Sequence, residues 1–335
     1  MAHNPKLQIF KISLNPRAKT KDACYRNFFR DKCFETQEET DKLTDAQIFK
    51  AYHQAFIKGI DVTDFYFFKD EKNKKAITIN DTNAIKKHDS DNIIEGIIKG
   101  GRYDQEREKV NMSNKKVDKV KKDDIILDQF YFLIYTPLKS STGILFLQSY
   151  TEDSICDVFC KFIKSFFTYG DNYFDIRIES YMPQNLKEEY KKKAKLKGFS
   201  FSTKEIIGIV GEGVTVKEQE EFSVTINIQP IQRSNLHSIT NKVEKLLHLR
   251  FHNKELSQFS KRVYLEDDQN KAAYYDLEKD VNHIRPTIYL ENKIYIHPEN
   301  GLPDFDELKD FCMSQLKIII QELDKARIHE AAVIS

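Results

Sequence analysis

The sequence has no tryptophan, only five cysteines among its 335 residues and no long apolar run. Its longest apolar runs are about six residues, whereas a helix that spans a membrane needs about 20, so such a helix is excluded. Residues Met1–Phe10 lack a basic segment followed by a long apolar one, and we expect no signal peptide. An odd number of cysteines scattered among apolar residues is typical of free thiols in a reducing compartment. These absences predict a cytoplasmic protein with no membrane partner.

An excess of charge of either sign is also missing. The chain carries 53 Lys and Arg residues against 52 Asp and Glu residues, a formal net charge of +1. The overall charge therefore gives no reason to expect a nucleic-acid partner, and only a local basic patch would. What the chain does contain is 24 phenylalanines and 16 tyrosines, whose large buried areas compensate for the missing tryptophan.

The common catalytic signatures are absent as well. Neither G-x-S-x-G nor H-E-x-x-H occurs in the chain. Gly208, Gly211 and Gly213 resemble a phosphate-binding loop only superficially, because no Lys-Ser or Lys-Thr pair and no helical pattern follow them. We therefore expect no cofactor, and the sequence favours a protein without catalytic activity.

The clearest structural pattern lies in Gln129–Phe167. Two continuous apolar runs, Phe130–Tyr135 and Ile144–Leu147, flank a segment rich in turn-forming residues. Continuous runs predict strands that are covered on both faces, near the middle of a sheet. The following residues, Thr151–Phe167, place apolar side chains at helical spacing, which predicts a helix lying on that sheet.

Strand-like and helical periodicities recur along the rest of the chain. The predicted strands are Leu7–Leu14, Asp64–Lys69, Ala76–Asn80, Asn92–Gly100, Tyr173–Tyr181, Glu221–Ile228, Lys261–Leu265 and Ala272–Asp276. The predicted helices are Ala23–Arg30, Thr44–Lys58, Pro183–Lys197, Asn235–Phe251 and Asp306–Arg327. Neighbouring strands look hairpin-linked, and no regular alternation of strand and helix occurs. We therefore expect an α+β fold with a mixed, mainly antiparallel sheet covered by helices.

A highly charged segment, residues 104–124, suggests a division of the chain. We expect a β-rich N-terminal part, residues 1–124, packed against an α+β C-terminal part, residues 125–335. The segment itself is either a solvated hairpin or loop, or a basic arm at Lys115–Lys122 that meets phosphates.

Local basic residues give the first functional hypothesis. Lys187, Lys191, Lys192 and Lys195 crowd the predicted helix Pro183–Lys197. They are candidate contacts for the phosphates of DNA or RNA, and Arg102 is a candidate to extend the patch. The alternative is an ordinary solvated helix in a lysine-rich protein.

Acidic residues near a lysine give a second hypothesis. Glu291 and Lys293 form an E-x-K pair in Thr287–His297, a segment read as one strand or as two runs around a turn. Nucleases of the PD-(D/E)xK kind use such a pair, with an upstream acid such as Asp276, to hold a divalent metal and position water. Residues of these types are common, so the pattern by itself does not define a site.

Two pairs with i, i+4 spacing raise the question of a metal. Cys156 and Cys160 form one pair, and His248 and His252 form the other. Together they would supply a Cys2His2 zinc site, but the short C-x2-C spacing of such sites is missing. The alternative is that both cysteines are small hydrophobic core residues, and we predict no metal site here.

The Gly-Gly-Arg-Tyr bend at 100–103, the runs at 130–137 and 143–150, and the helix after them suggest a relationship. This pattern, within residues 92–210, resembles strand-rich proteins of unassigned activity found in bacterial phage-defence loci. The resemblance implies an antiviral setting and assigns no functional residue.

These observations lead to one main hypothesis: a non-catalytic cytoplasmic binding protein of a bacterial antiviral defence system. Its candidate partners are DNA or RNA, another protein, or a second copy of itself. The alternatives are the metal-dependent nuclease and a structural subunit of a multi-protein complex.

Overall fold

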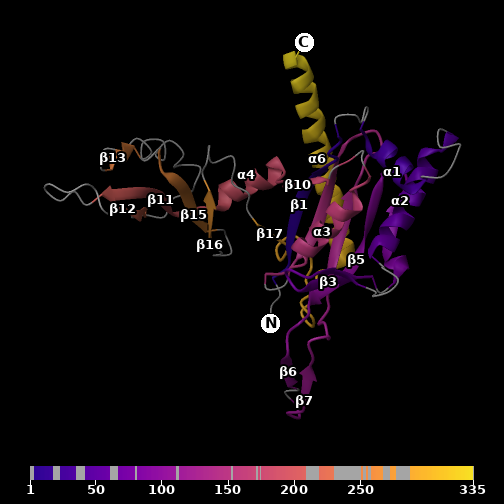
Figure 1. The fold of residues 1–335 in the computed structure, drawn as a ribbon, viewed down its shortest axis with the longest axis horizontal. Coiled ribbons are helices and arrows are strands. Elements are labelled where there is room, and N and C mark those ends of the chain that lie inside the picture. Colours follow the sequence, from indigo (N-terminus) through magenta and orange to yellow (C-terminus); the bar gives the residue numbers. More distant parts are fainter. Residues whose placement is uncertain are drawn as a thin grey trace. The chain divides into compact units, whose positions relative to one another are not determined.

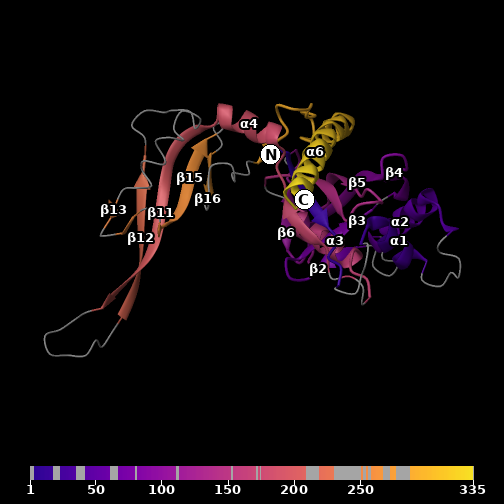
Figure 2. The same ribbon diagram turned by 90° about the horizontal axis from the view of Figure 1, so that it is seen from above.

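The structure is a computed structural model. It describes all residues except 1–3, 18–22, 35–41, 61–66, 80, 111–112, 152–153, 171–172, 174, 209–218, 230–249, 252–253, 256–257, 267–271, 277–286 and 335. The chain divides into two compact units (Figures 1 and 2). Unit 1 comprises Met1–Tyr181 together with Thr287–Ser335, and unit 2 comprises Met182–Pro286.

Unit 1 is built on a nine-stranded sheet. Seven strands follow in the order β10-β1-β9-β8-β5-β3-β2, while β17 pairs with β1 and β4 pairs with β5. The strands are β1 (Lys6–Ser13), β2 (Phe68–Asp70), β3 (Lys75–Thr78), β4 (Ile85–His88), β5 (Ile93–Arg102), β8 (Asp128–Tyr135), β9 (Thr142–Ser149), β10 (Arg177–Ser180) and β17 (Ile288–Tyr289). The two strands with continuous apolar sequences, β8 and β9, lie in the middle of the sheet, as predicted.

Three helices cover one face of this sheet (Figure 2). They are α1 (Tyr25–Cys33), α2 (Asp45–Ile60) and α3 (Cys156–Phe166). An aromatic core fills the space between them and the sheet: Phe29 and Tyr52 stack with centroids 3.8 Å apart, and Phe56 packs against Phe132 of β8. This core supplies the buried aromatic area that the sequence predicts in place of tryptophan.

The opposite face is covered by α6 (Phe305–Ile334). Glu95 of β5 points to this side, because its neighbours along the strand face the aromatic core. Its buried carboxylate accepts hydrogen bonds from Lys309 Nζ at 2.6 Å and Tyr131 Oη at 2.6 Å, and His88 Nε2 lies 2.7 Å away. The polar network therefore ties the C-terminal helix to the centre of the sheet.

Unit 2 consists of one described helix and a smaller antiparallel sheet with the order β12-β11-β15-β16. Its elements are α4 (Gln184–Lys193), β11 (Lys195–Gly208), β12 (Gln219–Ile228), β15 (Ser260–Glu266) and β16 (Ala272–Asp276), with a short pair, β13 (Arg250–Phe251) and β14 (Lys254–Glu255). Phe199, Phe201, Val263 and Leu265 form an apolar cluster on one face of the sheet, and Tyr190 of α4 packs against it.

The predicted α+β class with mainly antiparallel sheets is confirmed, since every strand pairing among the described residues is antiparallel. The division of the chain differs from the expected one at 124/125. Strands β5 and β8 lie on either side of that point and pair from Ile93–Tyr135 to Gly100–Asp128. The charged segment between them is an insertion into unit 1, and the boundaries between the two units fall after Tyr181 and before Thr287 in the chain.

The insertion is a hairpin of β6 (Arg107–Val110) and β7 (Val117–Val120) that projects from the sheet of unit 1 (Figure 1). At its base the Asp104 N–H donates to the Lys122 carbonyl oxygen at 2.9 Å. Strand β5 passes close by, and a Cβ atom on Gly101 would lie 1.9 Å from the Ile126 carbonyl oxygen. A side chain does not fit there, which explains a glycine at the bend.

Candidate nucleic-acid interface

Three of the four lysines of α4 lie at its C-terminal end, and Lys187 lies near its start. Lys191, Lys192 and Lys193 occupy the last turn, where positive charge is favoured by the helix dipole. Lys193 Nζ donates to Glu189 Oε1 one turn earlier, at 2.9 Å. Lys192 is exposed and makes no ion pair with any residue that the structure describes. These lysines thus stabilise the helix, and the charge of Lys192 stays directed to solvent.

Lys195 does not lie on this helix, and the expectation of a helix through Lys197 is corrected here. Ala194 already has an extended backbone, with ψ 135°, and β11 begins at Lys195. The reason is burial: on a strand, Leu196 and Phe199 both reach the apolar cluster of the sheet. A β-bulge between Leu196 and Gly198 keeps Leu196 and Phe199 on the same face of the sheet.

The other face of this sheet is polar. Strand β11 reads FSFSTK from residue 199 to 204, so its phenylalanines face the cluster while Ser200, Ser202 and Lys204 face the opposite side. The register places Arg262 opposite Ser200 and Tyr264 opposite Gly198. We call this surface the polar face; it consists of Lys195, Ser200, Ser202, Lys204, Ser223, Thr225, Asn227, Arg262 and Tyr264.

A glycine lies beside the aromatic ring of the polar face. A Cβ atom on Gly198 would approach the Ile228 carbonyl oxygen to 2.8 Å, so the backbones here are too close for a side chain. Tyr264 is half-buried, and its cross-strand neighbour on β11, Gly198, has no side chain.

Basic residues outnumber acidic ones along this surface. Lys197 Nζ lies 3.0 Å from Glu266 Oε1, and Arg262 Nε lies 2.9 Å from Asp276 Oδ1. Lys195 is half-buried and makes no ion pair with any residue in the described part of the chain. Among the described side chains, Lys195, Lys197, Lys204 and Arg262 lie along this surface with two carboxylates, Glu266 and Asp276.

The charge of unit 2 as a whole has the same sign. Residues 182–286 contain 18 Lys and Arg residues against 15 Asp and Glu residues, a net charge of +3. Since the whole chain has a net charge of +1, the remaining residues carry −2. The excess of positive over negative charge therefore lies in unit 2.

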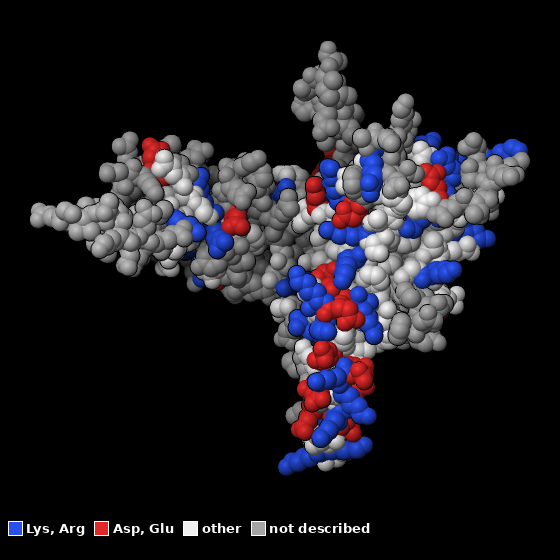
Figure 3. Space-filling model, viewed as in Figure 1, with Lys and Arg blue, Asp and Glu red and all other residues white. Residues whose placement is uncertain are grey.

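The remaining basic candidates belong to unit 1. Arg102 is exposed at the end of β5, so the structure assigns it to a different unit from Lys187, Lys191, Lys192 and Lys195. The β6–β7 hairpin is not a basic arm: Glu108 lies opposite Lys119 and Lys109 opposite Asp118 in the register. Figure 3 shows the two signs intermixed along it. Its charges therefore compensate each other across the strands.

The nuclease residues do not share one element or one unit. Asp276 ends β16 in unit 2, whereas Glu291 and Lys293 follow β17 in unit 1. Residues 291–293 form a turn, closed by the Lys293 N–H donating to the Leu290 carbonyl oxygen at 2.9 Å. Strand β17 ends at Tyr289, so the E-x-K pair is not carried by a strand. The Lys293 ammonium group lies over the ring of Phe311, with Nζ 5.7 Å from the ring centroid.

Metal ligands do not assemble among the described residues either. There, no group of three or more His, Cys, Asp or Glu side chains is placed to hold a metal ion. His248 and His252 lie outside the described residues. Cys156 and Cys160 are half-buried at the rim of the aromatic core, with their Sγ atoms 3.9 Å apart.

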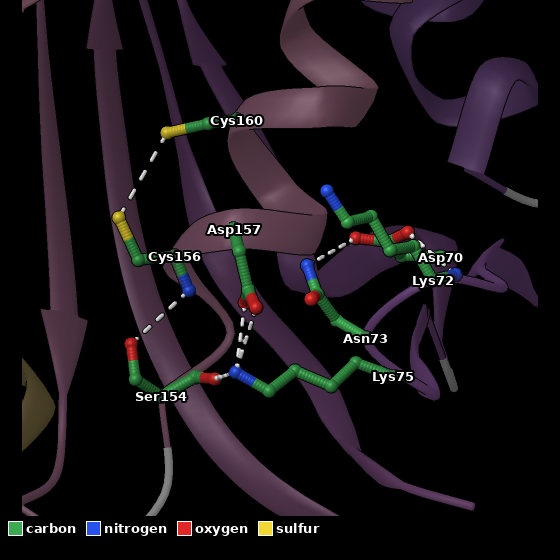
Figure 4. Close-up of polar contacts among 8 residues, drawn as sticks. All are labelled: Asp70, Lys72, Asn73, Lys75, Ser154, Cys156, Asp157 and Cys160. Atoms are coloured by element: carbon green, nitrogen blue, oxygen red, sulfur yellow. Dashed lines mark hydrogen bonds and ion pairs between the residues drawn. The ribbon is translucent and has the colours of Figure 1, made fainter. Parts of the chain in front are cut away.

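A second polar cluster surrounds the start of α3 (Figure 4). Lys75 of β3 donates to the Ser154 carbonyl oxygen at 2.7 Å and to both carboxylate oxygens of Asp157 at 2.9 Å. Beside it, Asp70 accepts hydrogen bonds from Asn73 Nδ2 at 2.8 Å and Lys161 Nζ at 3.0 Å. Burial alone would raise the pKa of Asp70, but these bonds hold it below its ordinary value.

No family model, curated protein or solved structure matches this chain. None of the described helices is long and apolar enough to cross a membrane.

The polar face was missed by sequence reasoning, although one signal was present. The alternation of Phe199 and Phe201 with Ser200 and Ser202 is a strand pattern with one polar side. The contribution of Arg262 and Tyr264 depends on the pairing of β15 with β11, which no local pattern specifies.

Proposed function

We propose that the protein is a non-catalytic, cytoplasmic binding protein whose unit 2 binds single-stranded nucleic acid. The observation that carries this proposal is the polar face, where Lys195, Lys204 and Arg262 lie on the same side of one sheet as Tyr264. Lys192, on the last turn of α4, lies three residues before the start of β11 and adds a further exposed charge.

The chemistry of the surface supports a strand with exposed bases. Proteins that bind single strands combine positive charge along the backbone with an aromatic ring on which a base stacks. The hydroxyl and amide groups of Ser202, Thr225 and Asn227 add hydrogen-bonding capacity without repelling phosphates. A half-buried tyrosine with no side chain opposite it on β11 supplies the stacking position.

Double-stranded DNA fits less well. Helix α4 does not present an uninterrupted row of basic residues to a groove, since three of its four lysines lie in the last turn and Glu188 and Glu189 lie between them and Lys187. An antiparallel sheet with an open polar face instead suits an extended single strand.

The proposal is tested by fluorescence anisotropy with a mixed-sequence single-stranded oligonucleotide. Wild type is compared with a Lys192→Glu, Lys195→Glu double variant. The matched control reverses Lys115 and Lys116, two lysines of the β6–β7 hairpin. We expect the first variant to bind about tenfold more weakly or worse, because two phosphate contacts are lost. The control should bind like wild type, and equal affinity for all three proteins contradicts the proposal.

An antiviral setting is part of the proposal and rests on the sequence resemblance alone. Binding of single strands is compatible with it, because invading nucleic acids expose single-stranded segments when they are copied. Loss of phage protection in cells expressing the Lys192→Glu, Lys195→Glu variant, with protection retained by the hairpin control, would support this setting.

A further inference from the structure

Cys156 and Cys160 are separate from the proposed interface, since they lie in unit 1 on the first turns of α3. Their Sγ atoms are 3.9 Å apart, and neither cysteine is part of a disulfide (Figure 4). Both side chains are half-buried, in contrast to Cys312 of α6, which is buried. The two thiols are therefore close to each other and open to small reagents.

A disulfide between these thiols meets the Cα spacing and requires a local change at the start of α3. Residues four apart in an α-helix have Cα atoms about 6.2 Å apart, given a rise of about 1.5 Å per residue and a radius of about 2.3 Å. This value lies inside the range of about 4.4–6.8 Å found for disulfides. The sulfurs need to approach by about 2 Å. The Cβ atoms of residues four apart are about 5–6 Å apart in a regular helix, whereas a disulfide holds them about 3.8 Å apart. The first turn of α3, which begins at Cys156, must therefore loosen for the S–S bond to form.

The surroundings favour a thiolate at Cys156. It is the first residue of α3, its N–H donates to Ser154 Oγ at 3.2 Å, and a helix N-terminus stabilises negative charge. The hydrogen bond from Cys160 lowers the pKa of Cys156, against burial and the nearby Asp157, and Lys75 assists. Cys33 is the opposite case, since burial raises its pKa to about 11. One thiol of the pair is thus activated, and the other lies in position to react with it.

We propose that Cys156 and Cys160 form a redox-active dithiol that a hydroperoxide converts reversibly into a disulfide. Cys156 is the residue attacked first, and Cys160 is the resolving cysteine.

The chemistry is balanced in two steps. The Cys156 thiolate attacks the nearer oxygen of hydrogen peroxide, the O–O bond breaks, and the product is a sulfenic acid with release of water after one proton is taken up. The Cys160 thiol then attacks the sulfenic sulfur, an S–S bond forms, and a second water leaves. Two thiols and one peroxide give one disulfide and two waters, and a small thiol reverses the product by exchange.

The test uses the full chain and mass spectrometry. Trypsin releases residues 140–161 as one peptide that contains both cysteines, and residues 33–42 as a peptide that contains Cys33. After treatment with limited hydrogen peroxide and then iodoacetamide, we expect the first peptide to have lost two hydrogens and to carry no label. Dithiothreitol should restore two labelling sites, while Cys33 remains a labelled thiol throughout.

Variants separate the two roles. In Cys160→Ser, the sulfenic acid at Cys156 should persist and be captured by dimedone. In Cys156→Ser, Cys160 should remain reduced. Without peroxide at pH 7, iodoacetamide should modify Cys156 about tenfold faster than Cys33, because the thiolate fraction is larger. Equal rates at the two cysteines, or oxidation of wild-type Cys156 to a sulfinic acid with no disulfide, would overturn the proposal.

Discussion

Lys309 of α6 and Glu95 of β5 form a contact of 2.6 Å between Nζ and Oε1, in which the carboxylate is buried. The two residues are more than 200 positions apart in the chain. Glu95 lies on a central strand of the sheet of unit 1, and Lys309 lies on the helix that covers one face of that sheet. Their pairing explains how the C-terminal helix, which follows unit 2 in sequence, returns to the sheet of unit 1.

Removing the cation should destabilise unit 1. In Lys309→Met the Glu95 carboxylate loses the lysine that pairs with it among the described residues and remains buried with Tyr131 and His88. An uncompensated buried charge costs about 3 kcal/mol. Urea unfolding followed by circular dichroism measures this loss. The matched control is Lys317→Met on the exposed side of α6, which should change the free energy of unfolding by less than about 0.5 kcal/mol. Equal effects of the two substitutions would show that the contact contributes little.

The same carboxylate predicts how stability depends on pH. Burial alone would raise the pKa of Glu95, but hydrogen bonds from Lys309, Tyr131 and His88 hold it below the ordinary value of 4.5. A pKa that is lower in the folded than in the unfolded state stabilises the fold above pH 4.5, and this contribution disappears as the pH falls through the folded pKa. Urea unfolding between pH 7 and pH 3 should therefore show a smaller acid-induced loss in Glu95→Gln than in wild type. Parallel curves would contradict this assignment.

The start of α2 offers a local test of the fold. Thr44 Oγ1 accepts a hydrogen bond from the Gln47 N–H at 3.3 Å, and Gln47 Oε1 accepts one from the Thr44 N–H at 2.9 Å. This reciprocal capping box predicts that Thr44→Ala lowers the free energy of unfolding by about 1 kcal/mol. Thr44→Ser keeps the hydroxyl and should retain most of the stability, so an equal loss in both variants would argue against the cap.

The aromatic ring of the polar face should contribute to binding rather than to stability alone. Tyr264→Ala should weaken the affinity for a single-stranded oligonucleotide about tenfold, because stacking of one base contributes about 1–3 kcal/mol. Tyr264→Phe keeps the ring and should bind nearly as well as wild type. If the phenylalanine variant binds as weakly as the alanine variant, stacking is not the role of this residue.

Local periodicity was sufficient for most individual elements. The alternation in Leu7–Leu14 corresponds to β1, the continuous runs correspond to β8 and β9, and the apolar stripe of the following segment corresponds to α3. These patterns succeed because each side chain is buried or exposed according to the period of its own element.

The features that were not foreseen depend on contacts between distant residues. Lys195 was expected on a helix, yet it belongs to a strand because Leu196 and Phe199 pack against β15. The charged segment at 104–124 resembled a boundary, yet β5 and β8 pair across it. The polar face likewise exists only once β11, β12 and β15 are side by side, and no single strand supplies more than four of its nine residues.

The salt dependence of binding tests the central proposal most directly. The slope of the logarithm of affinity against the logarithm of salt concentration reports the number of phosphates neutralised, at about 0.7 per phosphate for single strands. Replacing Lys192 and Lys195 by glutamine should reduce the steepness of this slope by about 1.4, whereas the same replacement of Lys115 and Lys116 should leave it unchanged. An unchanged slope in the first variant, or no measurable binding by the wild-type protein at low salt, would contradict a nucleic-acid interface on unit 2.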